Sequence, residues 1–295
     1  MNKHAMTIGK VAALVVWTAV LGACKPAAAP SGEAYGNDSV PPAAALYSAA
    51  AAAGGLEIPR TVQGREGQVL RREGYTASYN VQNRIPNWVA WHLTASHTNG
   101  RYKRNTMVFH EDEDVREPRA TDVDYRSSGY DRGHMCPSGD NKWSKTAQDQ
   151  SFLFTNICPQ RHNLNVGAWN DVEIQCREWA KRYGDLYIVC GPVLYNQQHR
   201  TIGRNRVVVP EAFFKVVLRK TGRSASSRSQ GGYAAIGFVY ENRGASRDMS
   251  RFVKSIDEVE LLTGLDFFSA LPDDIENSIE SKADLREWYP LREIK

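Results

Sequence analysis

Two segments near the middle of the chain carry side chains suited to acid–base and phosphate chemistry. The first contains Asp-Arg-Gly-His at residues 131–134, which places the His134 imidazole two residues from the Arg132 guanidinium. An imidazole titrates near neutral pH and can accept a proton from water. A guanidinium can bind phosphate through paired hydrogen bonds. Gly133 between them permits close approach of other groups to the backbone.

The second segment extends to Arg177 and is predicted to include the start of a helix. If that helix begins near Gly167, Glu173 and Arg177 lie four residues apart on one face, with Asn165 at the N-terminal edge. The helix dipole, the guanidinium and the amide oxygen then point toward one region, which suits a phosphate. The alternative is an asparagine cap followed by an ordinary Glu–Arg ion pair. This segment alone leaves both interpretations open.

The surrounding elements are predicted from apolar runs and the glycines and prolines that interrupt them. Residues 168–183 form a predicted helix, because their apolar side chains recur at helical spacing before Gly184. Strands and helices do not alternate regularly, which favours an α+β fold with a central, largely antiparallel sheet. The tryptophans Trp88, Trp91 and Trp179 are expected in the core. The predicted strands span residues 88–93, 186–190, 207–209, 213–218 and 236–240.

Composition and charge restrict the function classes. The 295 residues are 42% hydrophobic and carry 37 basic and 33 acidic side chains, a formal charge of +4. This composition is globular, and no run after residue 24 is long enough to span a membrane. The small net charge means that any anion binding must come from a local cluster. Candidate basic residues for such a cluster are Arg101, Lys103, Arg104, Lys142, Lys145 and Arg161.

The N-terminus predicts export. Lys3 and Lys10 precede an uncharged run at residues 11–23, and Leu-Gly-Ala-Cys occupies residues 21–24. This pattern resembles a bacterial lipoprotein signal peptide spanning residues 1–23, with Cys24 as the lipidated residue. The resemblance implies a membrane-anchored protein of the periplasm or cell surface, with the outer membrane favoured. Residues 24–58, rich in Ala, Pro, Gly and Ser, are expected to form a flexible tether before a single domain at 59–295.

The predicted export also affects what is expected of the cysteines. In an oxidising compartment at least one disulfide is expected, with all three pairings open. A zinc site is not predicted, because no Cys-x-x-Cys spacing occurs. The acidic run at residues 110–114 lacks a calcium-loop pattern and is expected to be a solvated turn. The four cysteines that follow Cys24 are Cys136, Cys158, Cys176 and Cys190.

The ordered motifs together resemble one family. Asp-Arg-Gly-His at 131–134 is followed by Thr-Asn-Ile-x-Pro-Gln at 155–160, and then by Asn-x-x-x-Trp-x-x-x-Glu-x-x-x-Arg at 165–177. This order is similar to that of the DNA/RNA non-specific endonucleases of the ββα-metal superfamily. The likeness covers nearly all of residues 70–290. It implies the ββα-metal nuclease fold and a metal-dependent, sugar-non-specific endonuclease that leaves 5′-phosphate ends.

The resemblance also implies a role for each matching residue. His134 matches the general base that activates water, and Asn165 matches the protein ligand of a divalent ion. That ion is expected to be Mg²⁺, with Mn²⁺ or another divalent cation as the alternative. Arg177 matches the arginine that neutralises charge on the phosphate. Glu173 matches a residue that orients the water around the metal.

Three further residues are implied in positioning the substrate. Arg132 and Asn156 match groups that position the phosphate and the histidine, and Arg104 matches an arginine that contacts phosphate. Two rival functions remain open, a weakly catalytic nucleic-acid-binding module and a phosphodiesterase for another substrate. The sequence also leaves open whether the domain forms a homodimer and whether an inhibitor protein restrains it.

Overall fold

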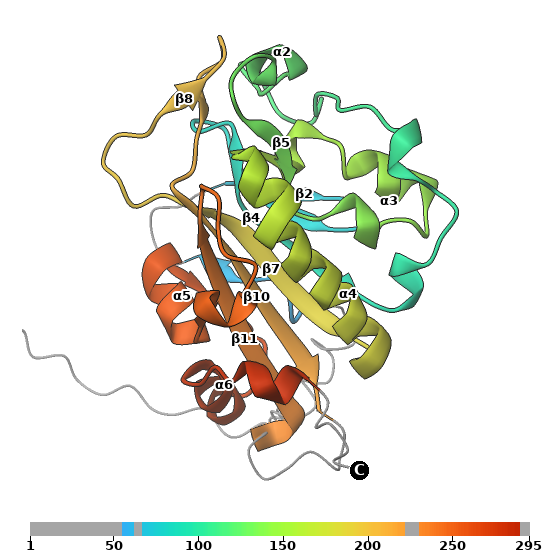
Figure 1. Ribbon diagram of the computed structural model, residues 1–295, viewed down its shortest axis with the longest axis vertical. Coiled ribbons are helices and arrows are strands. Elements are labelled where there is room, and N and C mark those ends of the chain that lie inside the picture. The colour runs from blue at the N-terminus through green and yellow to red at the C-terminus, as the bar shows by residue number, and fades with distance from the viewer. Residues whose placement is uncertain (1–54, 62–66, 222–229, 290–295) are drawn as a thin grey trace, which may run out of the picture. The chain divides into compact units, whose positions relative to one another are not determined.

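A seven-stranded antiparallel sheet is the central element of the computed structural model, which describes residues 55–61, 67–221 and 230–289 (Figure 1). Its strands lie in the order β12, β11, β10, β7, β4, β3 and β2. The strands are β2 Gln68–Arg71, β3 Thr76–Asn80, β4 Ile85–Leu93, β7 Leu186–Val193, β10 Ala212–Lys220, β11 Tyr233–Glu241 and β12 Val253–Lys254. The predicted α+β class is confirmed. The signal peptide, Cys24 and most of the tether lie outside the described residues.

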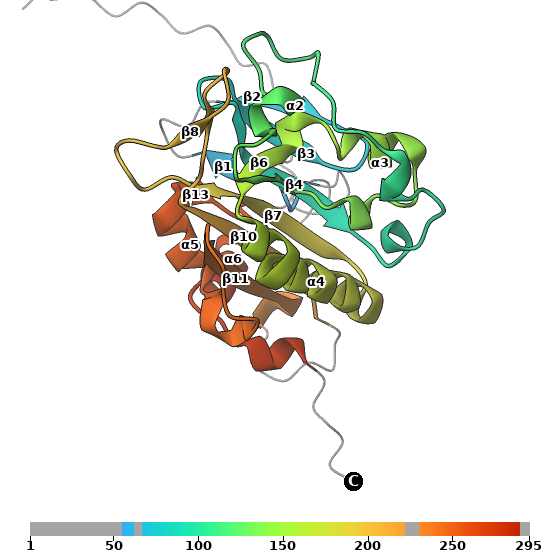
Figure 2. The same ribbon diagram turned by 45° about the horizontal axis from the view of Figure 1, so that its top comes forward.

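Both faces of this sheet are covered, because its central strands are apolar on both sides. In β10, Phe213 and Val217 pack into one core, whereas Phe214 and Val216 pack into the other. The first core includes side chains of α4 (Asn170–Tyr183), and Figure 1 shows this helix running along the sheet. The second core includes side chains of α5 (Ile256–Thr263) and α6 (Asp273–Glu280), which Figure 2 shows beside β10 and β11.

Smaller elements complete the fold and carry several loops. Strand β5 (Asp131–His134) pairs with β6 (Ile157–Gln160) on the α4 side of the sheet. Each of the five predicted strands lies within or overlaps one observed strand, namely β4, β7, β9, β10 or β11. The remaining named elements are β1 Arg60–Thr61, which pairs with β13 Leu265–Asp266, β8 Thr201–Ile202, which pairs with β9 Val207–Val208, and the short helices α2 Asp122–Tyr125 and α3 Lys145–Gln150.

Helix α4 begins two residues later than predicted and ends where predicted. A wider, π-helical turn at Leu164–Trp169 precedes it, and Gly167 breaks the helical geometry there with φ −102° and ψ −116°. The helix ends at Gly184, whose φ of 87° is accessible to glycine at little cost. Asn165 lies in this turn, whereas Glu173 and Arg177 lie on α4.

The expectation of a disulfide is wrong for the described cysteines. Cys136, Cys158, Cys176 and Cys190 are all free thiols and are buried. They serve as small apolar groups in the core on the α4 side, where burial raises the pKa of each thiol. An oxidising compartment permits disulfides but does not bring thiols into bonding geometry. Among the described residues, no helix has the length and apolar character needed to cross a membrane.

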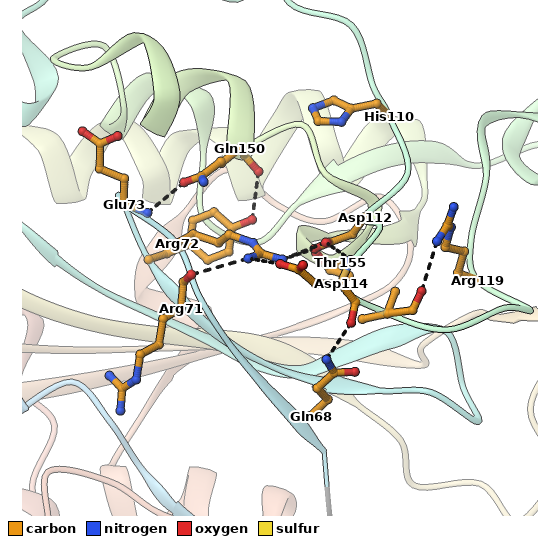
Figure 3. A network of polar contacts seen from close by, with 12 residues as sticks. Gln68, Arg71, Arg72, Glu73, His110, Asp112, Asp114, Arg119, Gln150 and Thr155 are labelled. Atoms are coloured by element: carbon orange, nitrogen blue, oxygen red, sulfur yellow. Dashed lines mark hydrogen bonds and ion pairs between the residues drawn. The ribbon is translucent and has the colours of Figure 1, made fainter.

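The acidic run at 110–114 is a solvated turn only in part, because Glu113 and Asp114 are exposed in a turn whereas Asp112 is buried. Asp112 is only 3% exposed, and its carboxylate accepts hydrogen bonds from Arg72 at 2.6 Å and from the Thr155 hydroxyl at 2.5 Å. Figure 3 shows Arg72 reaching both Asp112 and the exposed Asp114. The prediction was wrong for Asp112, because its partner Arg72 lies 40 residues away in the sequence. This network ties the end of β2 to the segment that leads into β6.

Candidate active site

His134 ends strand β5 and lies in an aromatic pocket. Residues two apart on a strand point to the same side, so Arg132 and His134 both reach Phe109, the ring of which lies 5.3 Å from the imidazole. His134 is 8% exposed, and its Nε2 atom is enclosed with no hydrogen-bond partner among the described residues. Burial, with a smaller effect from Arg104, lowers its pKa to about 3. The imidazole is therefore neutral at physiological pH and can accept a proton.

Two glycines allow neighbouring side chains to approach the site. A Cβ atom at Gly133 would lie 2.6 Å from the Cβ of Gln160, so the Asp-Arg-Gly-His strand can pair with β6 only with glycine there. A Cβ atom at Gly139 would lie 2.8 Å from Nη1 of Arg177. Gly139 thus leaves the path open along which Arg177 reaches its partner.

Arg177 pairs with Asp140 and not with Glu173 in the described structure. Its Nη1 donates to Oδ1 of Asp140 at 3.0 Å, while Nε1 of Trp91 donates to the other carboxylate oxygen at 3.1 Å. Burial raises the pKa of Asp140, and Arg177 opposes that effect. The ordinary Glu–Arg pair considered from the sequence does not form. Arg177 is instead fixed at one end while it lines the candidate cavity.

Glu173 lies one turn before Arg177 and faces a buried lysine that sequence reasoning missed. Burial raises the pKa of Glu173 to about 7, although Lys215 and Arg177 lower it. Lys215 is 1% exposed, and its ammonium lies 4.9 Å and 4.7 Å from the ring centres of Trp91 and Trp169. The available signal was a single cation within the apolar run of β10, at a position that faces the α4 side.

Asn165 has one side of its amide fixed. Its Nδ2 donates to Oδ2 of Asp131 at 2.9 Å, and the same oxygen contacts Nδ1 of His162 at 2.9 Å. Because the nitrogen is held, the amide oxygen is directed away from Asp131, and Asn165 lines the candidate cavity. The Asn165 amide oxygen and the Glu173 carboxylate, which line the same cavity, are both hard oxygen donors. This set fits Mg²⁺ with most of its coordination left to water and substrate.

One open cavity of about 600 Å³ brings these groups together. His134 and Asn165 line it from β5 and the π-helical turn, and Glu173 and Arg177 line it from α4. Four basic side chains but only one acidic side chain lie on its wall, so it favours anions. The predicted basic residues that line it are Lys103, Arg104 and Lys142. Arg101, Lys145 and Arg161 are not among its lining residues.

Arg132 and Asn156 support the site from outside the cavity lining. Arg132 forms an ion pair with Asp122, and its guanidinium lies 5.6 Å from the ring centre of Phe109. Asn156 is fully buried, accepts from the Cys136 backbone at 2.9 Å and donates to the carbonyl oxygens of Cys136 and Ser151. The contacts of Asn156 hold the backbone of Cys136, two residues after His134, against Ser151. Asn156 therefore lies where it can position the histidine, rather than where a polymer can touch it.

Comparison with known proteins then identifies the family. Residues 53–274 match the family model described as DNA/RNA non-specific endonuclease. The chain belongs to this family. The endonuclease family assignment agrees with the order of motifs around His134 and with the geometry of the cavity.

Individual relatives of this endonuclease family support the same conclusion. The chain is 34% identical over 211 residues to mitochondrial nuclease EXOG of Danio rerio, covering 67% of this chain and 60% of that protein. It is 32% identical over 223 residues to a nuclease of Nostoc sp., covering 73% and 78% of the two chains. The chain thus spans less than two thirds of the EXOG sequence.

A solved structure confirms the predicted ββα-metal nuclease fold. The crystal structure of the EndoG/EndoGI complex, which concerns the mechanism of EndoG inhibition, matches with a TM-score of 0.64 and 30% identity. The match covers 69% of this chain and 86% of that one. The endonuclease fold is therefore shared beyond the short motifs from which it was predicted.

Proposed function

We propose that this chain is a divalent-metal-dependent nuclease that cuts phosphodiester bonds within DNA and RNA and leaves 5′-phosphate ends. The observation that carries the proposal is the neutral, enclosed His134 in the same basic cavity as Asn165, Glu173 and Arg177. Membership of the non-specific endonuclease family supports it.

His134 acts as the general base in this proposal. A base must be unprotonated before the reaction, and a pKa near 3 keeps the imidazole neutral across the physiological range. Since Nε2 is enclosed, Nδ1 is the ring nitrogen that can meet a water molecule from the cavity. The rings of Phe109 and Phe152, whose centres lie 5.3 Å and 4.9 Å from that of the imidazole, limit its rotation. The proton of the attacking water passes to this nitrogen.

Arg177 and Asn165 provide for the charge on the phosphate. Arg177 places its guanidinium on the cavity wall, and the Asp140 contact reduces the freedom that it would otherwise lose on binding substrate. Asn165 would hold the metal through its amide oxygen, with Glu173 orienting the surrounding water. A bound Mg²⁺ would supply Lewis-acid stabilisation of the pentacovalent phosphate.

Broad substrate range follows from the chemistry of the cavity wall. Lys103, Arg104 and Lys142 can contact phosphate oxygens, which carry no sequence information and occur in both DNA and RNA. No described feature here selects the sugar. The cavity therefore favours sugar-non-specific cleavage over recognition of one base sequence.

The decisive experiment incubates the purified chain and His134→Ala with supercoiled plasmid and with single-stranded RNA. We expect Mg²⁺-dependent loss of both substrates, no loss in EDTA, and at least a roughly 10²-fold slower reaction in the variant. Cleavage of a small diester but not of polymer would favour the rival phosphodiesterase. Binding of both polymers without cleavage in Mg²⁺ or Mn²⁺ would favour the rival binding module.

We further propose that the nuclease is anchored in the outer membrane through lipid on Cys24. The sequence pattern at residues 11–24 supports this location. Bacterial expression with labelled palmitate should place label on the wild-type chain and none on Cys24→Ala. Labelling of both proteins, or recovery of both in the soluble fraction, would contradict the anchor.

A further inference from the structure

Three carboxylates gather on the opposite face of the sheet from the catalytic cavity. Asp257 and Glu260 lie three residues apart on α5, and Glu280 is the last residue of α6. One carboxylate oxygen from each residue lies within 4.8 Å of the corresponding oxygens of the other two. Side chains of α5 and α6 pack into the second core, so this cluster shares no residue with the candidate active site.

Glu280 distinguishes this cluster from an ordinary run of surface acids. The residue is 6% exposed, and its Oε1 atom is enclosed with no hydrogen-bond partner among the described residues. An enclosed carboxylate oxygen without a partner loses its hydration and gains nothing in return. Glu258 provides a contrast on the same helix, because it bonds the Ser255 backbone and pairs with Lys254 at 2.8 Å. A buried carboxylate aimed at two others implies a missing positive partner.

The surrounding charges strengthen that implication. Burial, followed by the fields of neighbouring carboxylates, raises the pKa of Glu280 to about 8. Burial also raises the pKa of Glu260 to about 7, although the Phe267 amide donates to it at 2.7 Å. Asp257 makes no ion pair in the described part of the chain, and the acid Asp266 adds further negative field. Nothing described on α5 or α6 neutralises the three groups together.

We propose that Asp257, Glu260 and Glu280 bind a divalent cation of the calcium class that joins α5 to α6. The donors are all carboxylate oxygens, which suit hard cations and disfavour zinc or copper. Ca²⁺ accepts carboxylates with one or both oxygens and irregular geometry, whereas Mg²⁺ requires near-ideal octahedral geometry. Asp257 is exposed, which leaves a side open for water ligands and for entry of the ion. The proposal is independent of the proposed nuclease function.

The test measures calcium binding directly on the whole chain. The protein is stripped with EDTA and titrated with CaCl₂ by calorimetry, and its Tm is recorded with and without Ca²⁺. Asn165→Ala serves as the background, because it removes the amide ligand from the catalytic cavity, and the cluster variants below then separate the two sites. We expect this background to bind Ca²⁺ and to gain Tm through ligand linkage.

Glu280→Gln in the same background should weaken Ca²⁺ binding at least about tenfold and abolish most of the Tm gain. Asp257→Asn is a second variant on the exposed edge, in case the buried substitution prevents folding, and should weaken binding similarly. The matched control is Asp274→Asn, which removes an exposed acid from α6 outside the cluster and should change nothing. Absence of Ca²⁺ binding in the Asn165→Ala background, or equal affinity with and without the cluster substitutions, would overturn the proposal.

Discussion

The two faces of the central sheet each enclose ionisable groups, but they supply different partners. On the α4 side, the buried carboxylate of Asp140 contacts Arg177, and Glu173 lies in the field of Lys215. On the α5–α6 side, Glu280 is enclosed beside two more carboxylates and has no cation among the described residues that pairs with it. Burial alone therefore does not decide whether a charge is tolerated, because the partner does.

This difference predicts opposite responses to pH. His134 on one face has its pKa lowered to about 3, and Glu280 on the other has its pKa raised to about 8. In both cases burial is the first cause and favours the neutral form. Acid must charge the histidine, whereas alkali must charge the glutamate. The first face is therefore expected to lose stability toward low pH, and the second toward high pH.

Removing the partner on the catalytic face should have the largest effect. Arg177→Met deletes a phosphate contact and leaves Asp140 buried without its cation. We expect kcat to fall roughly 10²- to 10³-fold and the free energy of unfolding to fall about 3 kcal/mol or more. Nuclease assays and urea denaturation at pH 7.5 measure the two losses. Arg182→Met, an exposed cation in the last turn of the same helix, is the control and should change neither.

The unpaired face should show the reverse effect. Glu280 has a folded pKa above its unfolded value, so its contribution to stability is present below about pH 4.5 and is lost as the pH rises toward 8. In EDTA, the free energy of unfolding of the wild type should therefore fall by about 3 kcal/mol relative to that of Glu280→Gln as the pH rises from 5 to 8. Urea denaturation at the two pH values tests this. A constant difference between the two proteins would show that Glu280 already has a partner.

The main strands and helix α4 could be predicted because local patterns of apolar residues determine them. Apolar runs bounded by glycine and proline located β4, β7, β10 and β11, and helical spacing located α4 up to Gly184. The resemblance then brought His134, Asn165, Glu173 and Arg177 into one site, and all four line one cavity. These residues could be found because polar residue types of this kind recur in a fixed order along a long stretch of the sequence.

What the sequence missed depends on partners that are distant in the chain. Asp112 looked solvated among other acids, but Arg72 from β2 makes it a buried ion pair. The predicted export favoured a disulfide among the cysteines, yet each of the four packs as a free thiol. Asn156 was implied to position the phosphate and the histidine, and its amide contacts the backbone of Cys136, two residues after His134. Residue types and their spacing in the sequence do not reveal which distant side chain or backbone group a polar atom will contact in the fold.

The histidine on the catalytic face gives a third test, opposite in sign to Glu280. Its folded pKa lies below its unfolded value, so its contribution to stability is present above about pH 6.5 and declines as the pH falls. As the pH falls from 6.5 to 5, the free energy of unfolding of the wild type should fall by about 2 kcal/mol relative to that of His134→Gln. Urea denaturation at both values measures this. His162→Gln, an exposed histidine, is the control, and an equal slope for wild type and His134→Gln would contradict the burial argument.

Lys215 gives the smallest but most specific test of why the catalytic face tolerates its acids. The Lys215→Met change keeps the length of the side chain and removes the cation, so packing against Trp91 and Trp169 is largely retained. Without the ammonium, the pKa of Glu173 should rise above about 7, and the protonated fraction at neutral pH should increase.

We expect kcat at pH 7 to fall about tenfold, equivalent to about 1.4 kcal/mol, with little change in KM. Raising the pH to 8.5 should recover much of the loss, because Glu173 then ionises. A purely structural role for Lys215 would instead give a loss independent of pH. Lys215→Arg, which restores the positive charge in a larger side chain, should recover part of the activity at pH 7, whereas equal loss in both variants would show that shape and not charge matters here. Recovery by charge would show that one buried cation makes the catalytic face differ from the face that holds Glu280.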